Sequence, residues 1–201
     1  MPEITSAIPL LAATAIAAYL LGAVPFGIVM ARVFGLGDLR QIGSGNIGAT
    51  NVLRTGNKLA AFLTLALDAG KGGIAVLIAR ALVGEDAAIL AGFAAFLGHL
   101  FPVYLGFKGG KGVATFLGTL LALSFPLGIA ACATWLVTAL ICRYSSLSAM
   151  TAAAFTPIWM GLLGHSEMIV LGIALALLIF LRHKDNISRL RAGEETKIGK
   201  K

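Results

Sequence analysis

The sequence predicts an all-α integral membrane protein with seven transmembrane helices, its N-terminus outside and its C-terminus in the cytoplasm. The composition is the first reason: 58% of the 201 residues are hydrophobic, 12% are charged and the mean hydropathy is +0.92, which is too apolar for a soluble domain of this length. Long uncharged runs rich in Ala, Leu and Ile recur without strand-like alternation. The basic residues collect between alternate runs, as the positive-inside rule requires. We therefore treat residues 1–201 as a single membrane domain with a basic cytoplasmic tail at 187–201.

The apolar runs define the expected helices. Residues 4–31 are uncharged and lack the basic start of a signal peptide, so we expect a retained first helix. The second run, 59–84, is interrupted by Asp68, Lys71 and Arg80. The remaining runs are 87–104, 112–142, 145–164 and 168–181.

The run 112–142 is predicted to cross the membrane twice. It is long for one helix and short for two, and the Ser-Phe-Pro-Leu-Gly stretch at 124–128 is typical of a turn. With this division, all 16 basic residues except Lys71 and Arg80 lie on the cytoplasmic side. Several spans are then short, which implies local thinning of the bilayer or shielding by neighbouring helices.

Charged and sulfur-bearing residues inside the runs have structural interpretations. Asp68 and Lys71 share one helix face, so we expect a mutually satisfied pair, with an ion relay as the alternative. Cys132 and Cys142 lie in apolar sequence and are expected to be buried small hydrophobes rather than a disulfide. No Cys, His or carboxylate cluster has metal-ligand spacing, so we predict no metal and no cofactor.

Polar motifs gather at the cytoplasmic ends of the predicted helices. Glycines let backbone N–H groups close around an oxyanion, while Lys and Arg neutralise its charge. Two such loops, at 43–54 and 106–112, indicate a site for more than one phosphate. The substrate-binding candidates in these loops are Ser44, Gly45, Asn46, Thr50, Lys108, Gly109 and Gly110. Further polar segments follow at 143–146 and 182–186.

Other anion-binding classes fit poorly. Gly43, Gly45 and Gly48 satisfy G-x-G-x-x-G, but no strand precedes them and Asp68, at the position of the ribose-binding acid, lies in a span. Neither Gly-Lys pair is a Walker A loop. The net charge of +7 is accounted for by topology, anionic lipid and anionic substrates, so we expect no nucleic acid partner. His99, beside a span end, is expected to be structural.

The motifs resemble those of the bacterial acyl-phosphate-dependent glycerol-3-phosphate acyltransferases, the PlsY family. The resemblance rests on GSGNIGATNVLRTG, GHLFPVYLGFKGGKGVAT, RYSSL and RHKDNISRLRAGEE, in the order and spacing of the family. It implies a multi-pass protein of the bacterial cytoplasmic (inner) membrane with its active site at the cytoplasmic face. The implied reaction moves an acyl group from acyl phosphate to the 1-hydroxyl of glycerol 3-phosphate, giving lysophosphatidic acid and inorganic phosphate in an early step of phospholipid synthesis.

The resemblance also suggests roles for individual residues. Arg54 and Lys111 are expected to clamp phosphate, and Ser146, His183 and Asn186 to complete the pocket, with His183, Asn186, Lys111 and Arg54 as the catalytic set. The acceptor of the hydroxyl proton stays open between His183 and a substrate phosphate oxygen. Direct docking of the soluble enzyme that forms acyl phosphate also stays open.

Two rival functions are weighed against this one. A transporter of organic phosphate would carry polar residues near the membrane midplane, often in two related halves. Here the polar motifs lie at one face and no halves match, although Asp68 and Lys71 keep the idea open. A non-catalytic membrane assembly factor would leave both phosphate-like loops unexplained.

Overall fold

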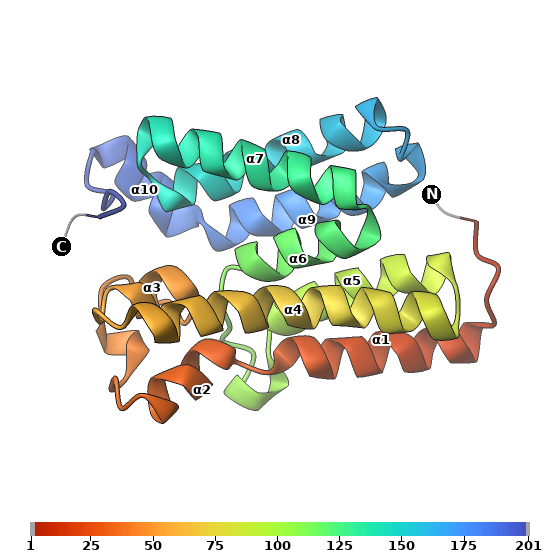
Figure 1. Ribbon diagram of the computed structural model, residues 1–201, viewed down its shortest axis with the longest axis horizontal. Coiled ribbons are helices and arrows are strands. Elements are labelled where there is room, and N and C mark those ends of the chain that lie inside the picture. Colours follow the sequence, from red (N-terminus) through yellow and green to blue (C-terminus); the bar gives the residue numbers. More distant parts are fainter. Residues whose placement is uncertain (1–2, 200–201) are drawn as a thin grey trace.

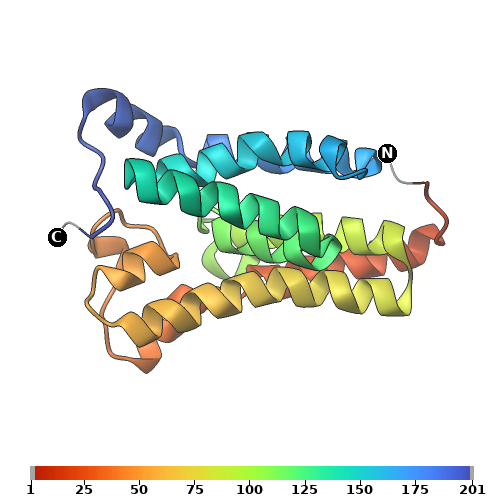
Figure 2. The same ribbon diagram turned by 45° about the horizontal axis from the view of Figure 1, so that its top comes forward.

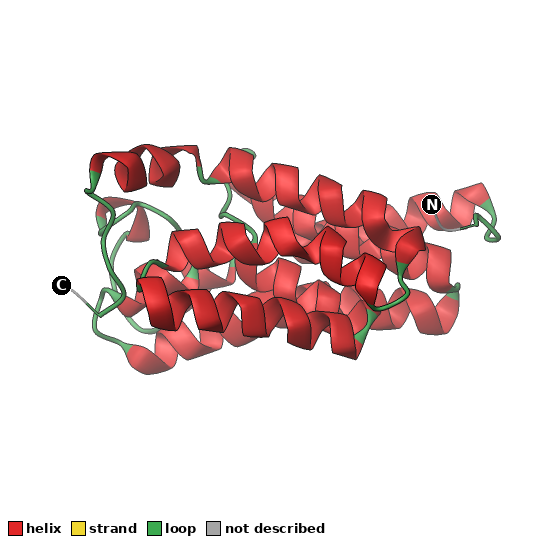
Figure 3. Cartoon of the chain, turned by 90° about the horizontal axis from the view of Figure 1, so that it is seen from above, coloured by secondary structure: helices red, strands yellow, loops and turns green. Residues whose placement is uncertain are grey.

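The computed structural model describes residues 3–199, which form helices and loops without a strand (Figure 3). Seven helices in this part have eleven or more residues and run alternately back and forth (Figure 1). They are α1 (Ile8–Ala23), α4 (Lys58–Leu82), α5 (Glu85–Leu100), α6 (Val113–Leu123), α7 (Phe125–Cys142), α8 (Ser145–Leu162) and α9 (Ile169–Arg182). The shorter elements are α2 (Phe26–Val33), η1 (Leu39–Gln41), α3 (Ala49–Leu53), η2 (Val103–Leu105), η3 (Ser166–Met168) and α10 (Lys184–Ala192).

The long helices form two groups joined by α6. In one group α1, α4 and α5 contact one another, and in the other α8 packs between α7 and α9. Helix α6 contacts α4, α5 and α7 and lies between the groups (Figures 1 and 2). Small residues allow this close packing: a Cβ on Gly22 of α1 or on Gly118 of α6 would overlap the backbone of Ala95 or Ala69. Close backbone approach at glycine is typical of helix interfaces in membranes.

The first apolar run is broken, which the sequence analysis did not predict. Helix α1 ends at Ala23 and α2 begins at Phe26, with Pro25 at the junction. Proline has no N–H and clashes with the preceding turn, so it interrupts the helix. The Val24 carbonyl oxygen then accepts a hydrogen bond from Lys71 Nζ at 2.8 Å. The break therefore supplies a partner for a charge buried in the bundle.

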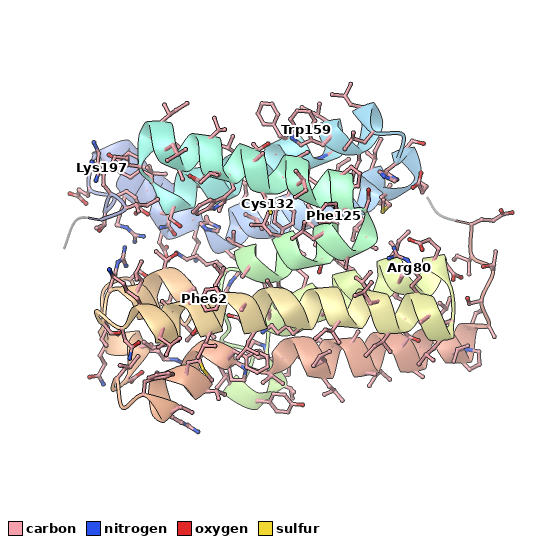
Figure 4. All side chains as sticks on the ribbon, in the orientation of Figure 1. Phe62, Arg80, Phe125, Cys132, Trp159 and Lys197 are labelled. Carbon is pink, nitrogen blue, oxygen red and sulfur yellow. The ribbon has the colours of Figure 1, made fainter. Side chains whose placement is uncertain are left out.

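The chain has the features of a multi-pass membrane protein. Four helical stretches in the described residues are long and apolar enough to cross a membrane, or five if the bent pair Ser166–Arg182 and Lys184–Ala192 counts as one. Helix α6 is too short but mostly buried, and it meets protein rather than lipid on most sides. Large apolar side chains, such as Phe62 of α4 and Phe125 of α7, are exposed on the outer surface (Figure 4). So much exposed apolar surface is characteristic of contact with lipid.

The predicted division of 112–142 is confirmed, with a tighter turn than expected. Ser124 alone separates α6 from α7, and Phe125 and Pro126 already belong to the first turn of α7, where proline is tolerated. Arg80 lies beside this turn (Figure 4) and donates to the carbonyl oxygens of Ala122 and Leu123 at 2.6 and 2.9 Å. These bonds satisfy carbonyl groups that the end of α6 leaves free.

The basic tail contains a helix and folds back toward the turn between α7 and α8. Residues 184–192 form α10, bent by 60° from α9. Beyond α10 the chain folds back, and Ile198 N donates to the Arg143 carbonyl oxygen at 2.7 Å. Lys197 packs over the ring of Tyr144 at 5.6 Å. Lys200 and Lys201 lie outside the described residues.

Candidate active site

The four polar segments of the sequence meet at one end of the bundle. Figure 1 shows α3 and α10 at the same end, together with the turn between α7 and α8. The loop at 106–112 reaches this end from α5, because Lys111 bonds to Asn186 of α10. Thr50 of α3 lies 3.4 Å from Ser145 of α8, between their hydroxyl oxygens. Segments far apart in the chain therefore form one polar surface.

The first cluster is organised by Asn51. Its side chain is 1% exposed, and its Oδ1 accepts from Ser44 N at 3.1 Å and from Arg54 Nη1 at 3.4 Å. Its Nδ2 donates to the Leu39 carbonyl oxygen at 2.8 Å. Asn51 thus fixes Ser44 and Arg54 next to each other, while both remain exposed. Asn51 is not among the site residues predicted from the sequence.

The second cluster is centred on Glu195. Its carboxylate accepts from Ser146 Oγ and Asn186 Nδ2, each at 2.6 Å, and from Arg189 Nε at 2.7 Å. Asn186 also accepts a hydrogen bond from Lys111 Nζ through Oδ1. Ser146, Asn186 and Lys111 are therefore brought together as predicted. Glu195 was missed as a site residue because a glutamate in a basic tail resembles a solvated residue.

The electrostatics of this cluster follow from its burial. Burial, together with the positive charges of Arg189 and Arg54, lowers the pKa of Lys111 to about 8. Burial alone would raise the pKa of Glu195, but hydrogen bonds from Ser146, Asn186 and Arg189 hold it below the ordinary value. The Lys111 ammonium is therefore partly desolvated, and the nearby Glu195 carboxylate already accepts three hydrogen bonds. Such an ammonium attracts an anion more strongly than one in water does.

His183, between α9 and α10, is neutral near pH 7. It is 2% exposed, and burial and the nearby Lys111 charge lower its pKa to about 4. Its Nδ1 lies 2.8 Å from the Ile179 carbonyl oxygen. Because a carbonyl only accepts, we assign the ring proton to Nδ1, which leaves Nε2 as an acceptor. A pKa this low makes His183 a weak proton acceptor but suits it to orient a hydroxyl.

The glycines of the second loop do not have the predicted arrangement. Gly109 N donates to the Leu100 carbonyl oxygen at 3.2 Å and Gly110 N to the His99 carbonyl oxygen at 3.1 Å. The expectation that both N–H groups close around a phosphate is therefore not met. A Cβ on Gly110 would overlap the ring of His99, so glycine is required here by packing.

The other binding candidates lie around the two clusters. Gly45 has a positive φ of 68°, which lets the first loop turn tightly. Asn46 is half-buried, whereas the side chains of Thr50 and Lys108 are exposed. The Lys108 carbonyl oxygen accepts from Arg40 Nη2 at 3.2 Å.

A buried ionic group lies between the helices. Lys71 Nζ is 2.9 Å from Asp68 Oδ1, and both residues are 2% exposed. This confirms the predicted pairing of the two charges. His99 Nδ1 lies 3.5 Å from the same carboxylate oxygen. The His99 ring also packs against Gly110, so His99 lies between the ion pair and the loop at 106–112.

An apolar, open-sided groove of about 570 Å³ adjoins the second cluster. Its lining includes Leu147 and Ile187, which directly follow Ser146 and Asn186 in the chain. Met150, Phe155 and Phe180 extend it along α8 and α9. Charge and apolar space therefore adjoin at this end of the bundle.

Cysteines and other metal-ligating residues are dispersed. Cys132 and Cys142 form no disulfide and are half-buried in α7. Cys132 lies among the side chains of the α7 group (Figure 4). Within residues 3–199, no three His, Cys, Asp or Glu side chains come together as a metal site needs.

The fold and the site define a class: an integral membrane protein with a cationic, hydrogen-bonding surface beside an apolar groove. The family model described as glycerol-3-phosphate acyltransferase matches residues 12–193. The chain belongs to this family.

Individual relatives agree with this assignment. A glycerol-3-phosphate acyltransferase of Jannaschia sp. (strain CCS1) is 70% identical over 200 residues, which cover 100% of this chain and 98% of the relative. One from Dinoroseobacter shibae is 64% identical and covers 100% of this chain and 99% of the relative.

Solved structures extend the likeness to the fold. The glycerol 3-phosphate form of PlsY, an integral membrane glycerol 3-phosphate acyltransferase, has a TM-score of 0.89 and 41% identity, covering 94% of this chain and 96% of that one. The lysophosphatidic acid form has a TM-score of 0.87 and 40% identity, covering 94% and 95%.

Proposed function

We propose that the protein transfers an acyl group from acyl phosphate to the 1-hydroxyl of glycerol 3-phosphate. The hydroxyl oxygen forms a bond to the acyl carbonyl carbon, and the bond from that carbon to the phosphate oxygen breaks. The hydroxyl proton ends on the released phosphate, so the products are lysophosphatidic acid and inorganic phosphate. No cofactor is needed, because the mixed anhydride already carries an activated acyl group.

One observation carries this proposal: four polar segments converge beside an apolar groove. Lys111 and Asn186 are bonded to each other, and the groove begins one residue after Ser146 and Asn186. Each substrate carries a phosphate and one also carries a fatty chain. A pocket with cations on one side and an apolar groove on the other matches both needs.

The cations have distinct surroundings in this proposal. Lys111 binds phosphate from a partly buried position, where a charge-assisted bond is strong. Arg54 acts from the opposite cluster and is oriented by Asn51. Ser44, Asn46 and Thr50 supply neutral donors near Arg54. Together these groups hold the reactants in line and stabilise charge on the leaving oxygen.

A substrate phosphate oxygen accepts the hydroxyl proton. The pKa of His183 is lowered to about 4 by burial, so the imidazole is a poor general base near neutral pH. A phosphate group has a second pKa of about 6 and finally keeps the proton. His183 Nε2 orients glycerol 3-phosphate by accepting a hydrogen bond from its 2-hydroxyl, so the proton of the 1-hydroxyl stays free to reach the phosphate oxygen.

The acyl chain occupies the groove along α8 and α9. Its volume of about 570 Å³ is within the range of ligand pockets. Its lining is mainly apolar, with Thr151 and Arg191 as the polar members. Phe155, Phe180 and Met150 would contact the methylene groups. Each buried methylene contributes about 0.8 kcal/mol, so the chain supplies much of the donor's affinity.

The membrane arrangement completes the proposal. All seven long helices cross the bacterial inner membrane, with the N-terminus outside and the site at the cytoplasmic face. The alternation of the helices and the collection of basic residues at one end support this orientation. Helix α6 crosses despite its length because other helices surround it.

The test uses purified protein in lipid vesicles with acyl phosphate and glycerol 3-phosphate, without CoA or metal. Phosphate release and lysophosphatidic acid formation in equal amounts are expected. Release that does not depend on glycerol 3-phosphate would indicate hydrolysis instead. Uptake of glycerol 3-phosphate into the vesicles without either product would favour the transporter.

A further inference from the structure

The loop that carries Lys111 is held through its backbone by two arginines. Arg182, the last residue of α9, donates from Nη2 to the Gly109 carbonyl oxygen at 2.7 Å and from Nε to the Gly110 carbonyl oxygen at 3.1 Å. Arg40 of η1 donates to the carbonyl oxygen of Lys108. Three successive carbonyl groups, those of Lys108, Gly109 and Gly110, therefore accept hydrogen bonds from two arginines in other parts of the chain.

The opposite edge of the loop is also fixed. The N–H groups of Gly109 and Gly110 donate to carbonyl oxygens at the end of α5. The ring of His99 fills the space that a side chain at Gly110 would need. The carbonyl and N–H groups of Gly109 and Gly110 are therefore all hydrogen-bonded, and Lys111 is the next residue in the loop.

Arg182 is built for this contact rather than for substrate. It is half-buried, and its guanidinium lies 5.6 Å from the centre of the Phe101 ring. The two donors on one edge of its fork, Nε and Nη2, both bond to backbone oxygen. A planar fork can hold two neighbouring carbonyl groups at once, which a single ammonium cannot do in the same way.

Arg182 and Asn186 lie four residues apart, on either side of the bend between α9 and α10. Arg182 holds Gly109 and Gly110, and Asn186 holds Lys111. We propose that Arg182 is a positioning residue for Lys111: it locks the glycine loop onto the α9–α10 bend and so fixes the ammonium at the phosphate position. This inference rests on the proposed role of Lys111 as the phosphate clamp.

The test compares Arg182→Gln and Arg182→Lys with Lys184→Gln in the full-length protein in vesicles. Lys184 is exposed and two residues away, so its variant removes the same charge from the same segment. Two quantities are measured: kcat and KM for glycerol 3-phosphate, and the rate at which an amine-acylating reagent modifies Lys111 without substrate, followed by mass spectrometry.

For Arg182→Gln we expect kcat to fall about tenfold or more, with a much smaller change in KM. Arg182→Lys should recover only a small part of kcat, and Lys111 should be modified faster in both variants. Lys184→Gln should match the parent protein. If Arg182→Gln does not fold, Arg182→Lys, which keeps the charge and the aliphatic stem, still gives both readouts.

Three outcomes would overturn the inference. Full activity in Arg182→Lys would show that charge alone matters, and a raised KM with unchanged kcat would show direct contact with substrate. Unchanged modification of Lys111 would show that its position does not depend on Arg182.

In a Lys111→Ala background, Arg182→Gln should add little further loss of activity, whereas a general structural role would add its full cost. Because the modification rate needs no turnover, failure of the proposed reaction remains distinguishable from failure of this inference.

Discussion

The burial of Lys111 predicts a pH limit on catalysis. Only the protonated amine can bind phosphate, and burial with nearby positive charge lowers its pKa to about 8. About nine-tenths of the free enzyme is then protonated at pH 7 and about one-tenth at pH 9. We expect kcat/KM to fall roughly tenfold between these values, because kcat/KM follows the ionisation of free enzyme. The direction is a loss of activity as the pH rises.

The assay measures initial phosphate release at subsaturating glycerol 3-phosphate from pH 6.5 to 9.5. Phosphate groups on both substrates have second pKa values of about 6, so their charge is constant above pH 7.5. Lys111→Arg supplies the control, because a guanidinium stays protonated throughout this range. Its profile should stay flat above pH 8, at a lower absolute rate. A flat profile for the parent protein, or the same decline in Lys111→Arg, would refute the reasoning.

Three further predictions concern other parts of the site. His183→Ala should lower kcat. The pH profile of kcat for the parent protein should show no ionisation near pH 6.5, because the pKa of His183 is lowered to about 4. An ionisation near pH 6.5 that is lost in His183→Ala would instead identify His183 as the general base. Glu195→Ala should reduce the free energy of unfolding by about 1.5 to 3 kcal/mol, as measured by thermal denaturation, whereas Glu194→Ala, an exposed neighbour, should not. Because the folded pKa of Glu195 is lowered, its contribution should be present above its ordinary pKa of 4.5 and be lost as the pH falls through the folded value. Gly110→Ala should reduce both thermal stability and activity through the overlap with His99, whereas Gly70→Ala, with open space around its Cβ, should leave both nearly unchanged; equal effects would argue against the packing role.

Local sequence pattern predicted most of the helices. Apolar runs bounded by charge correspond to the long helices within a few residues, and the Ser-Phe-Pro stretch identified the turn before α7. The break at Pro25 was missed because residues on both sides are equally apolar, so hydropathy does not change there. The membrane-crossing number stays a prediction, because α6 and α8 lack the length or apolarity that defines a span.

The sequence selected polar residues that the fold brings together, but not the hydrogen bonds that connect them. The fold brings together Lys111, Asn186 and Ser146, as expected. Polar groups that are partly buried need hydrogen-bond partners, and these three side chains supply them through Asn186 and Glu195. The use of the Gly109 and Gly110 N–H groups was not predicted, since glycine content cannot distinguish an anion cradle from tight packing. Glu195 was not selected because its partners, Ser146 and Asn186, are defined only by the folded chain.

The buried Lys71 has a consequence for how the chain enters the membrane. Its ammonium bonds to Asp68 on its own helix and to the Val24 carbonyl oxygen freed by the Pro25 break. The first partner travels with α4, and the second belongs to a helix synthesised earlier. A hydrogen-bond acceptor for the Lys71 ammonium is therefore already present in the first apolar segment when α4 enters the membrane. A substitution at Pro25 that restored an unbroken first helix would engage the Val24 carbonyl oxygen within the helix. It would thereby hinder membrane insertion of α4, independently of any effect on catalysis.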